Sequence, residues 1–209
     1  MSLNDLIISD IKLSLFETTI IKSLNIFYNN SKNIELIKTL LLIKTKLSIR
    51  LIDYFTTKYS KLNKITYNIN NSSFNVFISY KQQLKMYQKK YFDPFSRGCR
   101  IPFFLYDSTD KCENYSTNEC KDSYTSLITT IGQLNFFKWF IEKNIYDYIL
   151  DNYENIESSM NIHNKEIKDT KKNIKNIKKK NNNISTNIIV QNNINYNTNL
   201  MPIVVSFSF

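Results

Sequence analysis

The first third of the chain alternates apolar and polar residues with the period of an α-helix. Leucine and isoleucine recur every three or four positions over residues 3–30 and again over 34–60, which predicts two amphipathic helices. In the second helix the apolar and polar phases slip between Thr45 and Ser48, so we expect it to bend or break there. We assign residues 1–45 to an N-terminal helical extension.

The segment 46–160, which we expect to form the folded core, contains two stretches rich in strand-forming residues. Residues 64–69 (KITYNI) and 74–80 (FNVFISY) are rich in β-branched and aromatic residues, and the Asn- and Ser-rich stretch between them has the composition of a turn. This arrangement predicts a β-hairpin. Residues 101–106 (IPFFLY) predict a short edge strand with its proline at the start.

Two further helices are predicted in the core. One spans 80–91 and is expected to end before Pro94, because the residue preceding a proline is pushed out of the helical region. The other spans 131–158, with Thr129 or Thr130 as its N-cap.

The last part of the chain changes composition twice. Residues 161–199 are rich in Lys and Asn and nearly lack aromatic residues, so we expect a disordered linker. Residues 200–209 alternate apolar and smaller groups, which predicts a strand that pairs with the hairpin or with another chain. The predicted fold class is therefore α+β: a small antiparallel sheet, made of the hairpin and the C-terminal strand, packed against two or three helices.

Composition limits the classes of protein to which the chain can belong. It contains no alanine and is dominated by amino acids with A/T-rich codons, so its net charge of +10 is weak evidence for a nucleic-acid partner. No run approaches the ~18 apolar residues of a membrane helix, and we expect no membrane contact. The first residues are acidic where a signal peptide is basic, and three cysteines do not suit a disulfide framework. We expect the protein in a reducing compartment.

The placement of charge is more informative than its sum. Residues 35–101 have 13 basic and 3 acidic side chains, whereas residues 102–160 have 4 basic and 10 acidic ones. Such segregation indicates either a polyanionic partner or pairing between the two segments.

The strongest functional signal is the block Tyr80–Ile101. It interleaves aromatic rings with cations around a single acid, Asp93, and phosphate backbones and bases are bound by cations and flat rings respectively. The candidate nucleic-acid-binding residues are Lys81, Lys85, Lys89, Lys90, Arg97 and Arg100.

The rings of this block have two interpretations. Tyr87, Tyr91 or Phe92 would stack on bases if exposed; alternatively they belong to the core and the lysines only solvate a helix. Trp139 is expected to anchor the core, the alternative being an exposed hot spot for a protein partner. The lysines between 171 and 180 either add nonspecific affinity or lie in a solvated linker.

Residues for catalysis or metal binding are poorly arranged. Cys99, Cys112 and Cys120 form no close pair, and His163 lies far from them in sequence, so we expect no zinc site and no Cys–His catalytic pair. Asp147 and Asp151 fit a solvated helix face better than an acid–base or Mg²⁺ pair. With two glycines in the chain no Gly-rich phosphate loop is possible. We expect no enzyme and no cofactor.

Three stretches resemble an uncharacterised protein family of nucleocytoplasmic large DNA viruses, the giant viruses. RLIDYFTTKYSK (50–61), FNVFISYKQQLKMYQKKYFDPFSR (74–97) and TTIGQLNFFKWFIEKNIYDYI (129–149) are similar to that family's RLIDWFVTNY, YKSQLKAYSKKQFDPFCR and TTIGQLNFFRWAI segments, in the same order. Tyr54 and Ser96 depart from the family's Trp and Cys. The resemblance implies a viral protein made in a host cell, and it implies no reaction.

Together these observations predict a non-enzymatic viral nucleic-acid-binding protein that acts in viral gene expression or genome packaging. It would contact phosphates without reading sequence, in the host cytoplasm or nucleus or in the virion. The alternative is a virion-structural or protein-interaction module that binds viral proteins and no nucleic acid.

Overall fold

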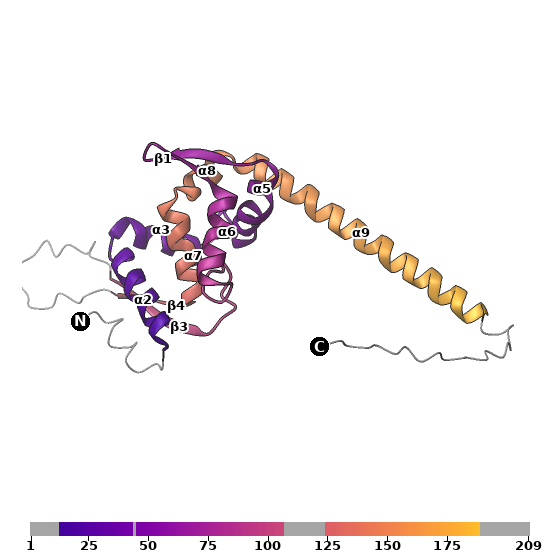
Figure 1. The fold of residues 1–209 in the computed structure, drawn as a ribbon, viewed down its shortest axis with the longest axis horizontal. Helices are drawn as coiled ribbons and strands as arrows, with labels where there is room; N and C mark the ends of the chain where they lie inside the picture. Colours follow the sequence, from indigo (N-terminus) through magenta and orange to yellow (C-terminus); the bar gives the residue numbers. More distant parts are fainter. Residues whose placement is uncertain (1–12, 44, 107–123, 189–209) are drawn as a thin grey trace, which may run out of the picture. The chain divides into compact units, whose positions relative to one another are not determined.

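The computed structural model describes residues 13–43, 45–106 and 124–188, with 173–188 described as helical backbone only (Figure 1). Two compact units divide the chain, Met1–Asn161 and Ile162–Phe209. The described elements follow one another in this order: α2 (Leu15–Phe27), α3 (Ser31–Leu41), α4 (Ile49–Tyr54), the π-helix η1 (Phe55–Tyr59), α5 (Ser60–Leu62), β1 (Thr66–Ile69), β2 (Ser72–Asn75), α6 (Val76–Tyr87), β3 (Arg100–Tyr106), β4 (Tyr124–Thr130), α7 (Ile131–Glu142), α8 (Ile145–Asp151) and α9 (Tyr153–Ile188).

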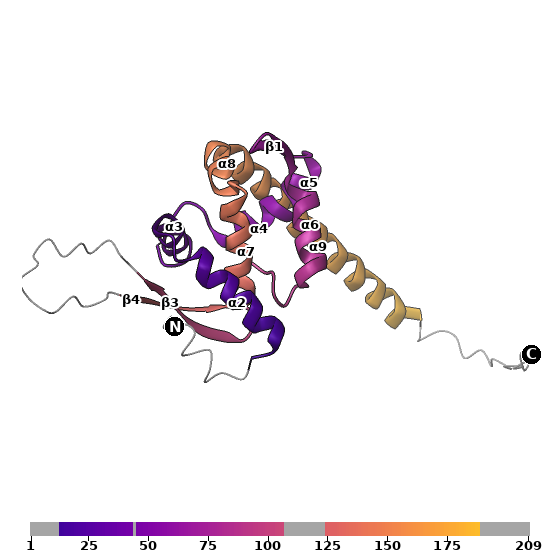
Figure 2. The same cartoon turned by 60° about the vertical axis from the view of Figure 1, so that its left-hand side comes forward.

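Helix α7 is the centre of the first unit. It contacts α2, α3, α8 and β4, and it lies among its neighbouring helices in Figures 1 and 2. Phe136, Phe137 and Phe140 are completely buried, and Trp139 is 3% exposed. The indole Nε1 of Trp139 donates to Ser79 Oγ at 3.0 Å. The prediction that Trp139 anchors the core is confirmed.

The N-terminal helices contribute to the same core. Ile21, Leu24 and Ile37 are buried in it, and the Tyr28 hydroxyl donates to the Leu134 carbonyl at 2.9 Å. The helix predicted over 3–30 has different bounds: it begins at Leu15, after the N-cap Ser14, and ends at Phe27, and residues 1–12 lie outside the described part.

The predicted break in the second helix is confirmed. Helix α3 ends at Leu41 and α4 begins at Ile49, with Ser48 as its N-cap.

The predicted hairpin is present but shorter than expected. Ile69 pairs with Ser72, and the two residues between them, Asn70 and Asn71, have φ of 48° and 62°, which suits the two-residue turn of a hairpin. The strand predicted over 74–80 is wrong beyond Asn75.

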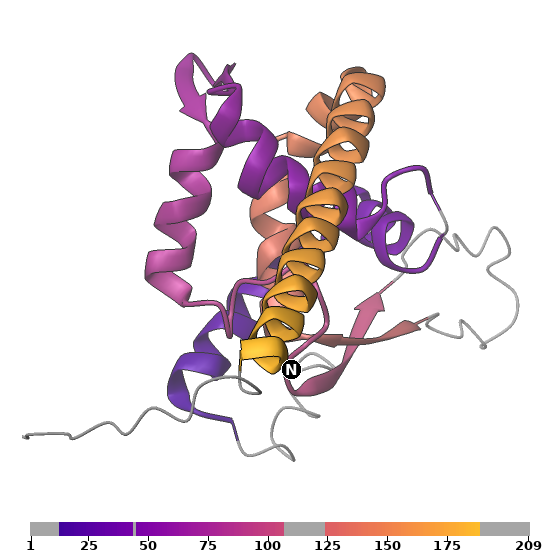
Figure 3. The ribbon, with the colours of Figure 1, turned by 90° about the vertical axis from the view of Figure 1, so that its right-hand side faces the viewer.

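Helix α6 replaces the end of that strand. Its first residues are β-branched or aromatic, but Asn75 Oδ1 accepts a hydrogen bond from the Ile78 N–H at 2.9 Å and so caps the helix. Tertiary packing and this cap outweigh the β-propensity of the sequence. In Figure 3 the hairpin leads directly into α6 at one edge of the unit.

The helix predicted over 80–91 therefore has different bounds. It ends at Tyr87 rather than near Pro94, because Gln88 has a positive φ of 58° with ψ of 170°, which departs from helical backbone geometry.

A second sheet lies at the N-terminal end of α7. The strand predicted over 101–106 is confirmed as β3, and it pairs antiparallel with β4, with Arg100 opposite Thr130. The sequence did not predict β4. Among described residues β1–β2 and β3–β4 are two separate sheets, and the predicted C-terminal strand over 200–209 lies outside the described residues.

Thr130 caps α7 as predicted, with its Oγ1 accepting from the Gln133 N–H at 3.1 Å. The helix predicted over 131–158 is interrupted, since Asn144 has φ of 50° between α7 and α8. Helix α9 then runs to Ile188 (Figure 1), so residues 161–188 are helical where the sequence predicted a disordered linker.

No helix in the described residues is long and apolar enough to span a bilayer.

Candidate nucleic-acid interface

The six predicted binding residues are all exposed but lie on three different elements. Lys81 and Lys85 belong to α6. Lys89, Lys90 and Arg97 belong to the segment between α6 and β3, called here the 88–99 turn, and Arg100 begins β3. The six side chains have different surroundings, and these decide whether each cation is available to bind a phosphate.

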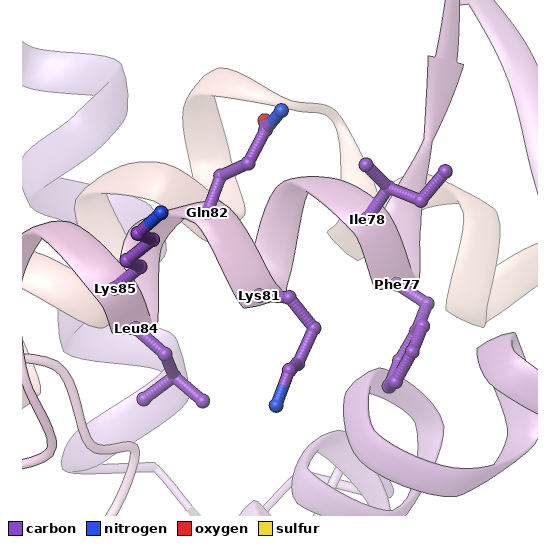
Figure 4. Close-up of a pocket in the computed structure, with 6 residues that line it drawn as sticks. All are labelled: Phe77, Ile78, Lys81, Gln82, Leu84 and Lys85. Carbon is purple, nitrogen blue, oxygen red and sulfur yellow. The ribbon is translucent and has the colours of Figure 1, made fainter.

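The α6 lysines flank an open hollow of about 590 Å³ (Figure 4). Phe77, Lys81 and Leu84 point to one side of the helix, as expected from their spacing of four and three residues. The hollow is lined by Phe77, Ile78, Lys81, Gln82, Leu84 and Lys85. Lys81 and Lys85 form no ion pair with the part of the chain that the structure describes.

A third lysine joins this surface from α5. Lys61 Nζ lies 5.7 Å from the centroid of the Phe77 ring, a cation–π distance, and α5 packs on α6. We call Lys61, Lys81 and Lys85, together with the half-buried Phe77, the basic face. From residue 54 to residue 92 the sequence contains seven lysines and no acid, so no neighbour in sequence neutralises this face.

Arg97 has a different role, because its guanidinium is already occupied. Its Nε and Nη2 donate to both carboxylate oxygens of Asp93, at 2.9 and 2.6 Å. Asp93 is 8% exposed, and Arg97 also lies 4.8 Å from the Phe95 ring centroid. Since a bidentate Arg–carboxylate pair uses the fork that would grip a phosphate, Arg97 primarily neutralises a buried acid.

Lys90 is occupied as well. Its Nζ lies 3.3 Å from Glu17 Oε1 and 2.7 Å from the Tyr91 hydroxyl, and Tyr91 donates to the same Glu17 oxygen at 3.0 Å. The pKa of Glu17 falls to about 2, chiefly because the Ser14 backbone N–H donates to its carboxylate, with Tyr91 and Lys90 lowering it further. Lys90 thus ties the 88–99 turn to the N-terminus of α2.

The 88–99 turn is fixed to α7 through its backbone. Gln133 Nε2 donates to the Pro94 carbonyl and Asn135 Nδ2 to the Tyr91 carbonyl, each at 2.9 Å. The Asp93 N–H donates to the Gly132 carbonyl at 3.2 Å. A Cβ on Gly132 would lie 2.8 Å from the Lys90 carbonyl oxygen, so the close approach of turn and helix requires glycine.

A second hollow, of about 370 Å³, lies beside this turn, with mixed charge around it. Its lining includes Lys89, Arg97 and Asp93. The pKa of nearby Asp53 is raised, first by burial and then by the charge of Asp93, while Arg97 and Lys89 oppose the shift. Two carboxylates close to these cations make the second hollow a poorer phosphate site than the basic face.

The aromatic residues predicted to stack on bases are used inside the protein. Phe92 is 1% exposed and its ring packs 5.5 Å from Trp139 and 6.4 Å, stacked, from Tyr87. Tyr91 packs on Phe16 at 5.3 Å. The interpretation as core is confirmed for Phe92, whereas Tyr87 and Tyr91 are half-buried and pack against the core. Sequence reasoning missed Phe77 and Lys61, although the acid-free stretch of residues 54–92 was a visible signal for them.

Metal-ligand groups do not converge in the described residues. No cluster of three His, Cys, Asp or Glu side chains occurs there, and Cys99 is an exposed free thiol. Cys112 and Cys120 lie outside the described residues, so the absence of zinc stays a prediction.

Comparison with known proteins identifies the family. Residues 8–208 match the model of a family of unknown function, DUF7197. An uncharacterized protein of Acanthamoeba polyphaga mimivirus is 36% identical over 150 residues, which cover 68% of this chain and 54% of the viral protein. The chain thus spans about half the length of that relative. No solved structure matches the chain. The predicted relationship to an uncharacterised family of giant viruses is confirmed, and the chain belongs to this family of unknown function.

Proposed function

We propose that this protein is a non-enzymatic nucleic-acid-binding protein that acts in viral gene expression or genome packaging and holds phosphates on its basic face. One observation carries the proposal: Lys61, Lys81 and Lys85 are exposed, Lys61 Nζ lies 5.7 Å from the centroid of the half-buried Phe77 ring, and none of the three lysines forms an ion pair within the described residues. Lysines that pair with no acid of the protein are available to phosphates, and phosphate binding by lysines releases counterions.

Phe77 adds a preference that lysines alone lack. A base that stacks on an aromatic ring gains about 1–3 kcal/mol, and stacking needs a base that is not already paired in a duplex. The proposed ligand is therefore a single-stranded segment, held by phosphate contacts to the lysines with one base against Phe77.

A protein-interaction or virion-structural role is the second candidate, because apolar side chains share this region. Ile78 is 57% exposed and Met86 58% exposed on α6, and Leu62 is 70% exposed on α5. Exposed apolar side chains gathered on one surface are typical of protein contacts. That contact would weaken little as salt rises, whereas binding to nucleic acid would weaken steeply.

The test is binding of the purified chain to labelled single- and double-stranded DNA and RNA. A Lys61→Gln/Lys81→Gln/Lys85→Gln variant removes the basic face. Its matched control replaces three exposed lysines on other elements, Lys22→Gln/Lys32→Gln/Lys46→Gln, for the same loss of net charge. The proposal predicts that the first variant loses most of the binding and the control keeps most of it.

Two results would count against the proposal. Equal losses of binding in both triple variants would show that binding depends on net charge alone. Binding that is kept by the basic-face variant would indicate that the lysines between 165 and 180 hold the nucleic acid. Phe77→Leu tests the stacking step, since it should weaken binding to single strands more than binding to duplexes.

A further inference from the structure

Helix α9 has an apolar repeat that the fold of the first unit does not explain. Residues at alternating intervals of three and four along it form a single stripe, called here the seam. The seam consists of Ile156, Met160, His163, Ile167, Thr170, Ile174, Ile177, Asn181, Ile184 and Ile188. All but His163, Thr170 and Asn181 are apolar. This spacing averages 3.5 residues, which is the repeat of a left-handed coiled coil.

The two ends of the seam have different surroundings. Ile156 is completely buried in the first unit, and Met160 packs against the same core. Ile167, further along, is 39% exposed. In the second unit the described chain is this one helix.

A helix of this composition needs a partner. Residues 162–188 are mostly Asn, Lys and Ile, and Asn and β-branched residues are weaker helix formers than Ala or Leu. An isolated helix of that kind is marginal in water, and helices in proteins gain most of their stability by packing an apolar face. A seam of isoleucines supplies such a face, provided that another helix covers it.

We infer that residues 167–188 form a parallel, in-register coiled coil with other copies of this chain. With Ile167 at heptad position a, positions 174, 181 and 188 also take a, and positions 170, 177 and 184 take d. A single Asn at an a position, here Asn181, fixes register, because its polar group is best paired with the same residue of an identical neighbour. Isoleucine at both a and d favours more than two strands.

One charge pair beside the seam agrees with identical parallel neighbours, whereas Lys178 at position e and Lys180 at position g are both basic. Position g before Ile167 is Glu166, and position e after Thr170 is Lys171; both side chains are exposed. In a parallel coiled coil a g residue meets the e residue five positions later on the next helix, which brings Glu166 of one copy to Lys171 of another. The symmetry of identical helices repeats this pair at every interface.

This inference does not rest on the proposed nucleic-acid binding. The basic face lies on α5 and α6 in the first unit, whereas the seam from Ile167 onward lies in the second. Self-association can therefore fail while binding holds, and the reverse.

The mass of the full chain in solution, measured by sedimentation equilibrium over a concentration series, tests the inference. The expected result is reversible association from 24.8 kDa toward a discrete multiple, three or four copies by the choice of residues at a and d. Ile174→Asp/Ile177→Asp places charges in the seam and should leave a monomer. Asn176→Asp/Asn183→Asp adds the same charge at c positions and should associate like the parent. A monomeric parent, or equal behaviour of the two variants, would overturn the inference.

A cysteine at the end of the seam tests the direction of the helices. Ile188→Cys, in a chain with Cys99, Cys112 and Cys120 replaced by Ser, should form a disulfide between copies under mild oxidation, because parallel helices bring both cysteines together. Antiparallel helices would separate them by about 30 Å over this length, and the absence of crosslinking in an associated protein would refute the parallel arrangement. Asn181→Ile should strengthen association, since it replaces the one Asn of the seam by an apolar residue.

Discussion

Helix α6 and the 88–99 turn divide one basic stretch of sequence into two kinds of surface. Lys81 and Lys85 of α6 are exposed beside an open hollow and have no ion pair in the described residues. Lys90 and Arg97 of the turn are exposed too, yet each pairs with an acid, Glu17 and Asp93 respectively. Two exposed pairs of cations therefore differ in role: Lys90 and Arg97 pair with acids of the fold, whereas Lys81 and Lys85 remain available.

This difference changes how a binding experiment is designed. A variant that removed every cation of the block would lose the neutralising partner of buried Asp93 together with the proposed phosphate contacts. Loss of binding would then report loss of fold as readily as loss of the interface. Substitutions confined to the basic face separate the two effects.

The largest expected loss of stability follows from removing the ring of Phe92, which lies in the 88–99 turn and packs in the core. Phe92→Ala removes a side chain that is 1% exposed among Trp139, Phe136 and Tyr87, and should lower the free energy of unfolding by about 3–5 kcal/mol. Phe77→Ala, at the half-buried ring of the basic face, is the comparison and should cost clearly less. Urea unfolding measures both, and similar losses would contradict the assignment of one ring to the core and the other to the surface.

The contact between the turn and α7 predicts a difference between the two glycines of the chain. Gly132→Ala would place a Cβ 2.8 Å from the Lys90 carbonyl oxygen, whereas at Gly98 the nearest atom is Thr130 Cγ2 at 3.8 Å. We expect Gly132→Ala to lower the free energy of unfolding by about 1–3 kcal/mol, and Gly98→Ala to change it by less than about 1 kcal/mol. A tolerated alanine at 132 would show that the turn is not fixed against the helix.

Single cations of the two regions should differ in the same assay. Arg97→Ala leaves the 8% exposed Asp93 without its bidentate donor and should cost about 1–3 kcal/mol. Lys81→Ala should stay within about 0.5 kcal/mol of the parent, as exposed substitutions usually do. If Lys81 proved as costly as Arg97, the distinction between a structural and an available cation would not hold.

The smallest effect is a pH dependence at Asp53. Burial, and then the charge of Asp93, raise the pKa of Asp53, so the folded state holds this proton more tightly than the unfolded state. Stability then falls as pH rises from the usual Asp pKa through the raised one. Asp53→Asn removes that fall, so its stability relative to the parent should increase as pH rises above the usual Asp pKa. If the free energy of unfolding of the two proteins changed in parallel with pH, the pKa of Asp53 would not be raised by folding.

Local signals in the sequence predicted much of the fold. The cap at Thr130, the hairpin and strand β3 each depend on a few adjacent residues. The start of α6 was missed because the Asn75 cap competes with a run of β-forming residues, and β4 was missed because its strand partner is distant in sequence. The sequence predicts a disordered linker over the C-terminal part of α9, because its Lys and Asn content obscures the regular spacing of its isoleucines.

The candidate site was predicted less well, for a related reason. Lys90 and Lys85 look alike in sequence, and what separates them is the acid Glu17, 73 residues away from Lys90. Only the fold brings that acid close. The same holds for Lys61, which reaches Phe77 from α5.

The dependence of nucleic-acid affinity on salt tests the central claim most directly. The slope of log K against log salt concentration counts the phosphates that the protein contacts. For single-stranded DNA we predict that Lys61→Gln/Lys81→Gln/Lys85→Gln makes this slope shallower by about 2–3 while its unfolding curve stays that of the parent. An unchanged slope in a folded variant would contradict the claim that the basic face holds the nucleic acid.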